Sequence, residues 1–166
     1  TDSNGCTTSV LFAVTEPDAL EASILVSNVS CNGGNDGSVE LIITGGITPY
    51  TTEDLSGLSA GNYTTTITDS NGCTTSVLFA VTEPDILSTS VSVTDVSCNG
   101  GNDGSAELAI EGGTAPYTTE DLSELSAGTY STIITDANNC EISVEFTVSE
   151  PDILSASVSV TDVSCY

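Results

Sequence analysis

Residues 68–85 read TDSNGCTTSVLFAVTEPD, and residues 1–18 read the same. A third version, TDANNCEISVEFTVSEPD, follows at residues 135–152, another 67 positions along the chain. No insertion interrupts this spacing, and a fixed period is typical of a tandem array. A unit of 67 residues is long enough to form a small domain. The sequence therefore predicts two whole repeats, at 19–85 and 86–152, with the C-terminal fragment of a preceding repeat at 1–18 and the N-terminal fragment of a following repeat at 153–166.

Segments between the turns alternate apolar and polar residues with the period of a β-strand. In SVELIIT (38–44) and its copy SAELAIE (105–111), the same alternate positions are apolar in both copies, while of the intervening positions Ile42 becomes Ala109 and Thr44 becomes Glu111. The same test predicts that Ile142, Val144 and Phe146 face a core. Strands with one solvated face are typical of antiparallel sheets. We therefore expect antiparallel strands and no helix longer than a turn or two.

Turn sequences separate these predicted strands. NGGNDG (32–37) and DSNGC (69–73) supply the glycine, asparagine and aspartate that tight turns favour. In LSAGNY (58–63) a tyrosine follows a glycine by two positions where a strand begins, which resembles the tyrosine corner of immunoglobulin-like domains. Six or seven short strands are expected in each repeat. The predicted fold class is all-β, with tandem immunoglobulin-like β-sandwich modules at a 67-residue period.

The charge of the chain excludes several classes of function. Its 166 residues include no Lys, Arg or His, and the formal net charge is −24. No side chain can neutralise the phosphates of a nucleic acid or an anionic membrane surface. No segment approaches the roughly 18 apolar residues of a membrane span, so no membrane insertion is expected. A serine or cysteine nucleophile would lack its usual base, and the repeated Glu53–Asp54 pair is best explained as solvated surface, so we expect no enzyme.

Four motifs together resemble a known repeat. VSCNGGNDGS, GGITPY, LSAGNYTTTITDSNGC and a closing TEPD, in this order, resemble the SprB-type repeat of large cell-surface adhesins of gliding Bacteroidota. The resemblance covers both whole repeats and both fragments. One departure is that the segment PYTTEDLSGLSAG is short and lacks the tryptophan usual in the family, so an edge strand is expected to be missing.

The resemblance implies an extracellular location on the bacterial cell surface and a filamentous protein. The expected function is that of a structural repeat region, the stalk or filament of an adhesin, which acts as a stiff spacer. Its expected partners are neighbouring repeats of the same chain and other copies in a fibre. The alternative is that each repeat is itself a carbohydrate- or surface-binding module, dependent on calcium, with surface glycans as partners.

The cysteines occur twice in each period, as Cys6, Cys73 and Cys140 in one series and Cys31, Cys98 and Cys165 in the other. This count is typical of a disulfide framework in an exported protein. Within one repeat, Cys31 would pair with Cys73. In an immunoglobulin-like sandwich, however, the first turn and the last hairpin lie at opposite ends, beyond the roughly 5.5–6 Å between Cα atoms that a disulfide needs. In a linear array, Cys31 would instead face Cys140 of the next repeat. Both pairings stay open.

The sequence also suggests a calcium site and two N-glycosylation sites. Because Ca²⁺ takes oxygen ligands, calcium is the only cofactor that the acidic sequence suggests. Its candidate ligands are Asn35, Asp36, Asp69, Asn71, Glu83 and Asp85, although their spacing is not that of an EF-hand and a turn explains NGGNDG equally well. Asn28 and Asn62 match the N-glycosylation pattern, but the second repeat has Asp95 and Thr129 in their places.

Overall fold

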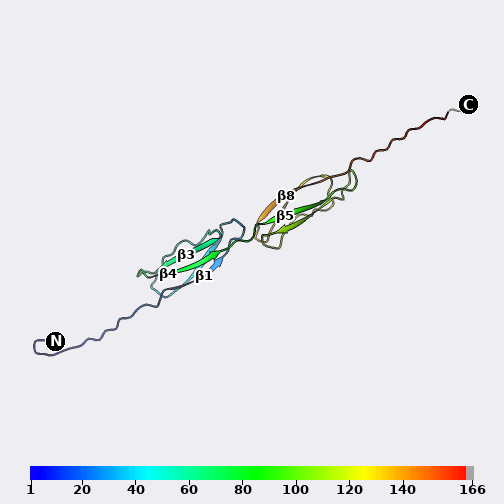
Figure 1. Cartoon of the computed structure of the whole chain (residues 1–166). Coiled ribbons are helices and arrows are strands. Elements are labelled where there is room, and N and C mark those ends of the chain that lie inside the picture. The colour runs from blue at the N-terminus through cyan, green and yellow to red at the C-terminus, as the bar shows by residue number, and fades with distance from the viewer. Residues whose placement is uncertain (164–166) are drawn as a thin grey trace. The chain divides into compact units, whose positions relative to one another are not determined.

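The computed structural model describes residues 1–163, and its regular structure consists of β-strands alone. The strands are β1 (Glu21–Ser27), β2 (Ser38–Thr44), β3 (Gly61–Thr68), β4 (Thr74–Val81), β5 (Ser88–Thr94), β6 (Ser105–Glu111), β7 (Gly128–Thr135) and β8 (Glu141–Val148), several of which are labelled in Figure 1. The all-β prediction is confirmed. The described residues contain no helix, and hence none long and apolar enough to cross a membrane.

Consecutive strands pair into antiparallel hairpins. β1 pairs with β2, β3 with β4, β5 with β6 and β7 with β8, and each pair is a two-stranded sheet. Each strand of the second set begins 67 residues after its counterpart, as Ser88 follows Glu21 (88 − 21). The structure thus has four strands per period instead of the six or seven expected, in sheets smaller than those of an immunoglobulin-like sandwich.

The segment 51–58 connects the two hairpins of the first unit without forming a strand. Thr51 and Leu58 form only isolated bridges, to Thr68 and Gly37 respectively. Between them the Asp54 carboxylate accepts hydrogen bonds from the backbone N–H of Ser56 at 3.1 Å and from its hydroxyl at 2.7 Å. The Leu55 carbonyl oxygen accepts the N–H of Val39 at 2.9 Å, so the segment contacts β2 through a single backbone hydrogen bond and does not form a strand ladder.

Strand formation also depends on a partner strand. The sequence TTSVLFAV forms β4 at 74–81, where β3 pairs with it along its whole length. The same eight residues at 7–14 form no strand, and the side chains of Val10, Leu11 and Phe12 are exposed there. A strand is stabilised by cross-strand pairs, so alternation alone does not produce one.

The chain divides into two compact units whose boundaries differ from those of the repeats. The first unit comprises Thr1–Asn28 and Asn35–Thr82. The second comprises Val29–Gly34 and the described residues from Glu83 onward. The short segment 29–34, which belongs to the first repeat in sequence, is therefore part of the second compact unit.

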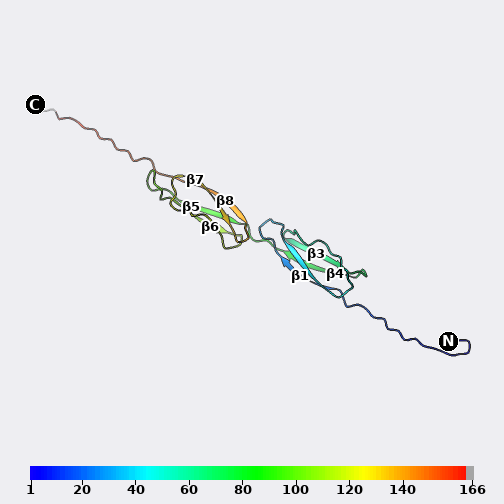
Figure 2. The same cartoon turned by 180° about the vertical axis from the view of Figure 1, so that it is seen from behind.

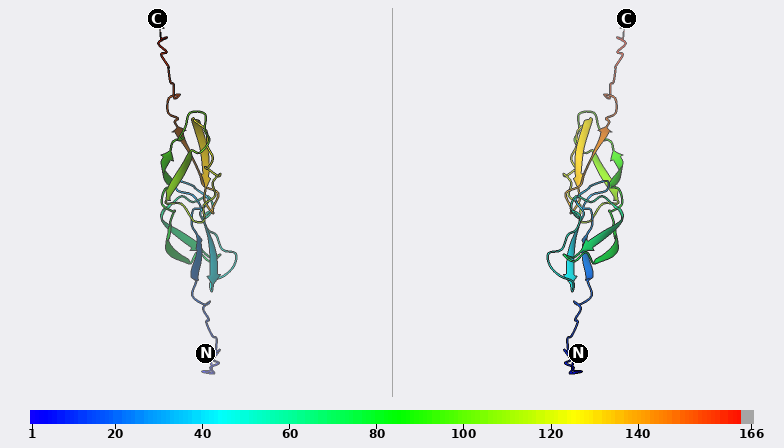
Figure 3. Two further views of the ribbon diagram at one scale, coloured as in Figure 1. Left: turned by 90° about the vertical axis from the view of Figure 1, so that its right-hand side faces the viewer. Right: turned by 90° about the vertical axis from the view of Figure 1, so that its left-hand side faces the viewer.

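Each unit packs its two hairpins together mainly through one pair of strands. In the first unit β1 packs against β4, and in the second β5 packs against β8. Figure 2 shows all four strands of the second unit, and Figure 3 shows the strands of each unit from two sides. The apolar positions predicted to face inward do so, since exposure alternates along every strand. In the second unit Val96, Phe146 and Val148 form a buried cluster.

A tyrosine anchors the third strand of each repeat. The ring of Tyr63 stacks on Phe79 with centroids 5.5 Å apart, and Tyr130 stacks on Phe146 at 5.6 Å. The Tyr63 hydroxyl donates to the carbonyl oxygen of Ser59 at 3.0 Å, and the Tyr130 hydroxyl donates to its counterpart four residues upstream at 2.9 Å. This is the bond to the preceding backbone that the sequence predicted.

The buried threonine of β3 offers a test of how each core is packed. The Thr65 side chain is 0 % exposed, and its hydroxyl oxygen has no hydrogen-bond partner among the described residues. Valine has the same shape without the hydroxyl, so Thr65→Val should raise the free energy of unfolding by about 1 kcal/mol. Urea unfolding followed by tyrosine fluorescence measures this change. The control, Thr64→Val on the exposed face, should stay within about 0.5 kcal/mol of the parent chain. A Thr65→Val chain less stable than the parent would contradict the expectation.

Candidate functional site

The segment 29–34 is held in the second unit by the TEPD sequence that follows β4. The side-chain amide of Asn32 donates to the carbonyl oxygen of Pro84 at 3.0 Å. The backbone N–H of Gly33 donates to the Glu83 carboxylate at 2.6 Å. Within the segment, the Gly34 N–H donates to the Cys31 carbonyl oxygen at 2.9 Å and closes a turn. These bonds fix the position from which Cys31 presents its sulfur.

The turn of the β7–β8 hairpin is built around one carboxylate. Asp136 Oδ1 accepts the backbone N–H groups of Asn138 and Cys140, both at 2.8 Å, and Oδ2 accepts that of Thr114 at 2.8 Å. Asn139 has a φ of 64°, in the left-handed region that asparagine tolerates better than most residues. The turn therefore has a defined shape before Cys140 bonds to anything.

Cys31 and Cys140 form a disulfide, with Cα atoms 5.7 Å apart and a sequence separation of 109. Beside the bond, the Asn138 side-chain amide donates to the Ser30 carbonyl oxygen at 2.9 Å. Of the two pairings that the sequence left open, the structure contains Cys31–Cys140, while Cys73 is a free, exposed thiol. Cys31 lies in the second unit and Cys73 in the first, so the two cysteines that share a repeat do not share a unit.

The remaining cysteines are not bonded in the described chain. Cys6 and Cys98 are free and exposed, like Cys73. Cys165, the last candidate, lies outside the described residues. A hollow of about 340 Å³ lies beside the bonded pair and is lined by Cys31, Asn32, Ile86, Leu87, Asn139, Cys140 and Glu141.

The charge state of the two hairpin-turn aspartates is set by backbone donors. Burial raises the pKa of the Asp136 carboxyl, but the N–H groups of Cys140, Thr114 and Asn138 together outweigh that effect and lower the pKa below its usual range. The pKa of Asp69, its counterpart, is lowered in the same way: burial raises it, but the N–H groups of Cys73, Ile47 and others outweigh that effect. Both turns are therefore stabilised by an ionised carboxylate.

The predicted calcium ligands are divided between the units. In the first unit Asn35 and Asp36 are exposed, and Asp69 accepts the N–H groups of Asn71, Cys73 and Ile47 at 2.9–3.0 Å. In the second unit Glu83 binds the 29–34 turn, and Asp85 is exposed. Over residues 1–163 no three or more His, Cys, Asp or Glu side chains are grouped to hold a metal. Calcium binding stays a prediction.

The two glycosylation candidates differ in their surroundings. Asn28 is exposed, and its side-chain oxygen accepts the backbone N–H of Thr82 at 3.0 Å. Asp95, its counterpart, accepts the N–H of Ser149 at 2.8 Å, so the acceptor is retained where the glycosylation pattern is lost. Asn62 is exposed on β3. The hydrogen bond to Thr82 therefore explains why residue 28 has a side-chain acceptor. Attachment of a glycan at either asparagine stays a prediction.

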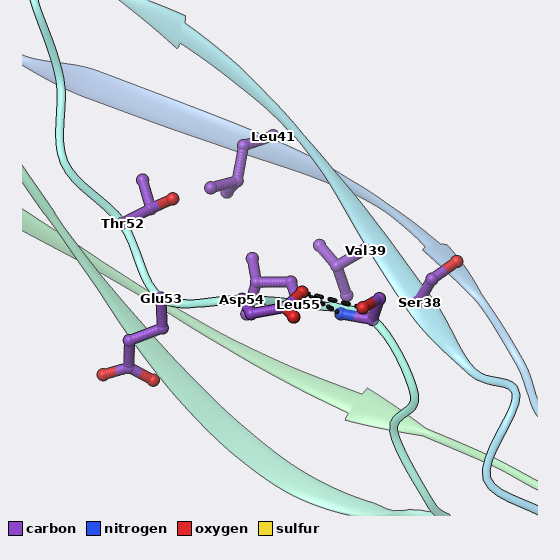
Figure 4. Close-up of a pocket in the computed structure, with 8 residues that line it drawn as sticks. Ser38, Val39, Leu41, Thr52, Glu53, Asp54 and Leu55 are labelled. Atoms are coloured by element: carbon purple, nitrogen blue, oxygen red, sulfur yellow. Dashed lines mark hydrogen bonds between the residues drawn. The ribbon is translucent and has the colours of Figure 1, made fainter.

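A shallow hollow of about 270 Å³ in the first unit contains the Glu53–Asp54 pair, and Figure 4 shows how these side chains lie. Asp54 is occupied by its hydrogen bonds to Ser56, which are drawn as dashed lines, and the Glu53 carboxylate extends away from Val39 and Leu41. Hydrogen bonds from the Ser56 hydroxyl and N–H lower the pKa of Asp54. The two carboxylates are arranged as separate surface groups.

The lowered pKa of Asp136 gives a pH prediction with a definite sign. Its ionised form stabilises the fold fully above the unfolded pKa of about 4, and this contribution is lost as the pH falls through the lower folded pKa. An asparagine side chain has one oxygen in place of two, so Asp136→Asn cannot accept hydrogen bonds at both the Oδ1 and the Oδ2 position. The thermal midpoint of this variant at pH 7 should be several degrees lower than that of the parent chain. Between pH 5 and pH 2, its thermal midpoint should decrease less than that of the parent. Circular dichroism melts measure both. Glu145→Gln, at an exposed position of β8, is the control and should behave like the parent. An unchanged acid slope in Asp136→Asn would rule out this role.

Comparison with known proteins identifies one family. The model of the SprB repeat matches residues 24–51 and 90–118. No curated protein and no solved structure matches the chain. The matched stretches run from β1 and β5 through the cysteine-bearing loop to the isolated bridges at Thr51 and Thr118. They include neither the β3–β4 nor the β7–β8 hairpin. The resemblance to the SprB-type repeat is confirmed over these two stretches, the first of which contains the first two of the four motifs, VSCNGGNDGS and GGITPY.

Proposed function

We propose that this chain is part of the stalk of an extracellular bacterial adhesin and acts as a stiff spacer. SprB repeats are structural repeats of cell-surface adhesins, which supports the location. The observation that carries the spacer role is the bond between Cys31 and Cys140, which closes a loop of the chain across 109 positions. A spacer must transmit tension without lengthening, and a covalent closure of this kind opposes lengthening.

The connectivity of the two units supports stiffness. The chain passes from one unit to the other at residues 28–29, 34–35 and 82–83, three times in all. Two domains joined by one linker can swivel about it, whereas three separate connections restrict that motion. The linking sequence TEPDILSTS (82–90) contains one proline and no glycine, and such linkers are stiffer than glycine-rich ones.

The contacts of the linker reduce its freedom further. Glu83 and Pro84 both accept hydrogen bonds from the 29–34 segment, at 2.6 and 3.0 Å. Like charges along a chain of net charge −24 repel one another and favour an extended state at low salt. The disulfide, the hydrogen bonds and the charge repulsion therefore all favour a stiff, extended chain.

We also propose that the two hairpins of each unit form a small sandwich of the immunoglobulin type. The packing of β1 on β4 and of β5 on β8 supports it, as does the tie from each strand-opening tyrosine to the preceding backbone. Seven-residue strands at roughly 3.3 Å per residue, with their turns, give such a unit a length on the order of 30–40 Å.

The alternative of a glycan-binding module is less well supported. Sugar sites commonly present exposed aromatic faces with free hydroxyls. All four tyrosines of the described chain donate their hydroxyls to backbone carbonyl oxygens at 2.6–3.0 Å, and two of them stack on phenylalanine. A glycan array probed with the labelled chain, with and without calcium, should show no binding above background. Specific binding to any glycan would favour the module.

A force measurement tests the spacer role directly. With the disulfide intact, pulling on the two ends cannot extend the closed loop between Cys31 and Cys140. Reduction should therefore release additional contour length of about 360–390 Å, since 109 residues extend to at most roughly 3.3–3.6 Å each. Single-molecule force spectroscopy with and without reductant measures the difference.

Two controls sharpen that measurement. Cys140→Ser should give the longer contour without reductant, and Cys73→Ser should behave like the parent chain. Equal contour lengths in oxidised and reduced parent chains would refute the covalent closure under load.

Solution scattering tests whether stiffness extends along an array. Chains with two, four and six repeats should lengthen linearly, by on the order of 30–40 Å per repeat. A flexible string of domains would instead lengthen with about the square root of repeat number. Square-root growth, or collapse to a globule, would remove the physical basis of the spacer.

A further inference from the structure

Strand β2 has one edge that is paired and one edge that is largely open. It pairs with β1 alone, yet the backbone N–H of Val39 donates to the carbonyl oxygen of Leu55 at 2.9 Å and so points away from β1. Backbone groups alternate in direction along an antiparallel strand, so the N–H and C=O groups of Leu41 and Ile43 point to the same outer edge. Within residues 1–163, no backbone or side-chain group bonds to them there.

The segment 51–58 covers only the start of this outer edge. Thr51 is bridged to Thr68 at the edge of β3, and the segment reaches β2 itself only at Leu55. Beside the uncovered part lies the shallow hollow of about 270 Å³ shown in Figure 4, which is lined by Ser38, Val39 and Leu41 of β2 and by residues 52–56. All of these residues belong to the first unit, so the open edge borders a hollow of its own unit.

The second repeat has the same open edge on β6. This strand pairs with β5 alone, and the N–H of Ala106 donates to the carbonyl oxygen of Leu122 at 2.9 Å. Leu108 and Ile110 therefore present their backbone groups as Leu41 and Ile43 do. The open edge is thus a feature of both whole repeats.

The open edge of β2 presents what a further strand needs. An unpaired edge is a template for another strand, and extended peptides bind proteins in this way. On an antiparallel partner, the side chains opposite Leu41 and Ile43 would lie on the inward face, beside the hollow. The side chains between them would lie on the outward face, next to Glu40. The edge therefore suits a segment that alternates apolar residues with residues that complement a carboxylate.

The charges around the edge select the partner. Glu40 is exposed on the outward face of β2, and Glu53 is exposed beside the hollow. Glu107 and Glu120 hold the equivalent positions in the second repeat, and both are exposed. The chain has no Lys, Arg or His and a formal net charge of −24, so a second copy is repelled and a basic segment is attracted.

We infer that the outer edges of β2 and β6 bind extended basic segments of other proteins, in which Lys or Arg alternates with apolar residues, by addition of an antiparallel strand. Leu41 and Ile43 would exchange backbone hydrogen bonds with two apolar residues of the segment, and Glu40 would pair with a basic side chain that lies between them. Such binding is independent of the spacer role, because the β2 edge does not depend on the Cys31–Cys140 bond.

Hydrogen exchange, followed by NMR on the full isotope-labelled chain, tests the binding with the capped peptide KVKVKVK as the probe. In the free chain the amides of Leu41 and Ile43 should exchange rapidly, while those of Glu40 and Ile42, which face β1, should be protected. With the peptide at about ten times its dissociation constant, exchange at Leu41 and Ile43 should slow about tenfold, because only the unbound fraction exchanges. The two equivalent amides of β6 should respond in the same way.

Three outcomes would overturn the inference. The first is unchanged exchange at the outward amides of both strands in the presence of KVKVKVK. The second is equal protection by the acidic peptide EVEVEVE, which would remove the role of charge. The third is protection that rises with chain concentration in the absence of peptide, because the occupant would then be a second copy.

Two variants use β6 of the same chain as a matched control. Ile43→Pro removes one outward N–H and leaves the hydrogen bonds between β2 and β1 in place. It should weaken peptide binding at β2 by roughly two- to tenfold, the effect of one lost hydrogen bond, and leave the affinity at β6 unchanged. Unchanged affinity at β2 would contradict strand addition.

Glu40→Gln tests the charge at an exposed position, where the fold tolerates substitution. It should weaken binding at β2 by roughly 1.5- to 5-fold, the range for one cross-strand pair of opposite charges, with no change at β6. The weakening should diminish at high salt, which screens exposed charges. An equal loss of affinity at β2 and β6 would show that net charge alone, and not this edge, attracts the peptide.

Discussion

The bond between Cys31 and Cys140 is the constraint on which the division of this chain depends. It keeps six residues of one repeat, 29–34, within the compact unit formed by the next. The hydrogen bonds around it do not depend on it: Glu83 holds the turn that carries one sulfur, Asp136 holds the turn that carries the other, and Asp69 makes the same bonds beside the unbonded Cys73. Preformed turns of this kind lower the entropy that the disulfide must otherwise remove, so the covalent bond joins surfaces that already fit.

Much of the fold could be predicted from the sequence because it is local. The period of two in β2 and β8 reports which side chains are buried, and the tyrosine ties at Tyr63 and Tyr130 lie within four residues of their acceptors. The strand count could not be predicted, because pairing is long-range. TTSVLFAV is a strand only where β3 lies beside it, and the segment 51–58 bridges its neighbouring strands only at isolated positions such as Thr51 and Leu58.

The partners of the carboxylates and of Cys31 were harder to predict, because they also depend on long-range contacts. Asp69 and Glu83 were grouped as cation ligands because a chain with no basic residues leaves carboxylates without evident partners. In the structure, both carboxylates accept backbone hydrogen bonds, three at Asp69 and one at Glu83, and calcium binding stays a prediction. Backbone donors occur at every residue except proline and leave no mark in the sequence. The disulfide pairing was undetermined for the same reason, since spacing allowed Cys31 two partners and only the grouping of segment 29–34 distinguishes them.

The position of the bond decides which strands would be loaded in a stalk. Tension that enters at the N-terminal side runs along β1 to Cys31, crosses the disulfide to Cys140, and continues along β8, which begins at the next residue. Six of the eight strands, β2 to β7, lie between the two cysteines and are bypassed. In the proposed stalk, their hydrogen bonds would need only to stabilise the folded units against thermal unfolding, while covalent bonds would carry the pull. This division of roles explains how small two-stranded sheets, which are individually weak, could serve in a structure under tension.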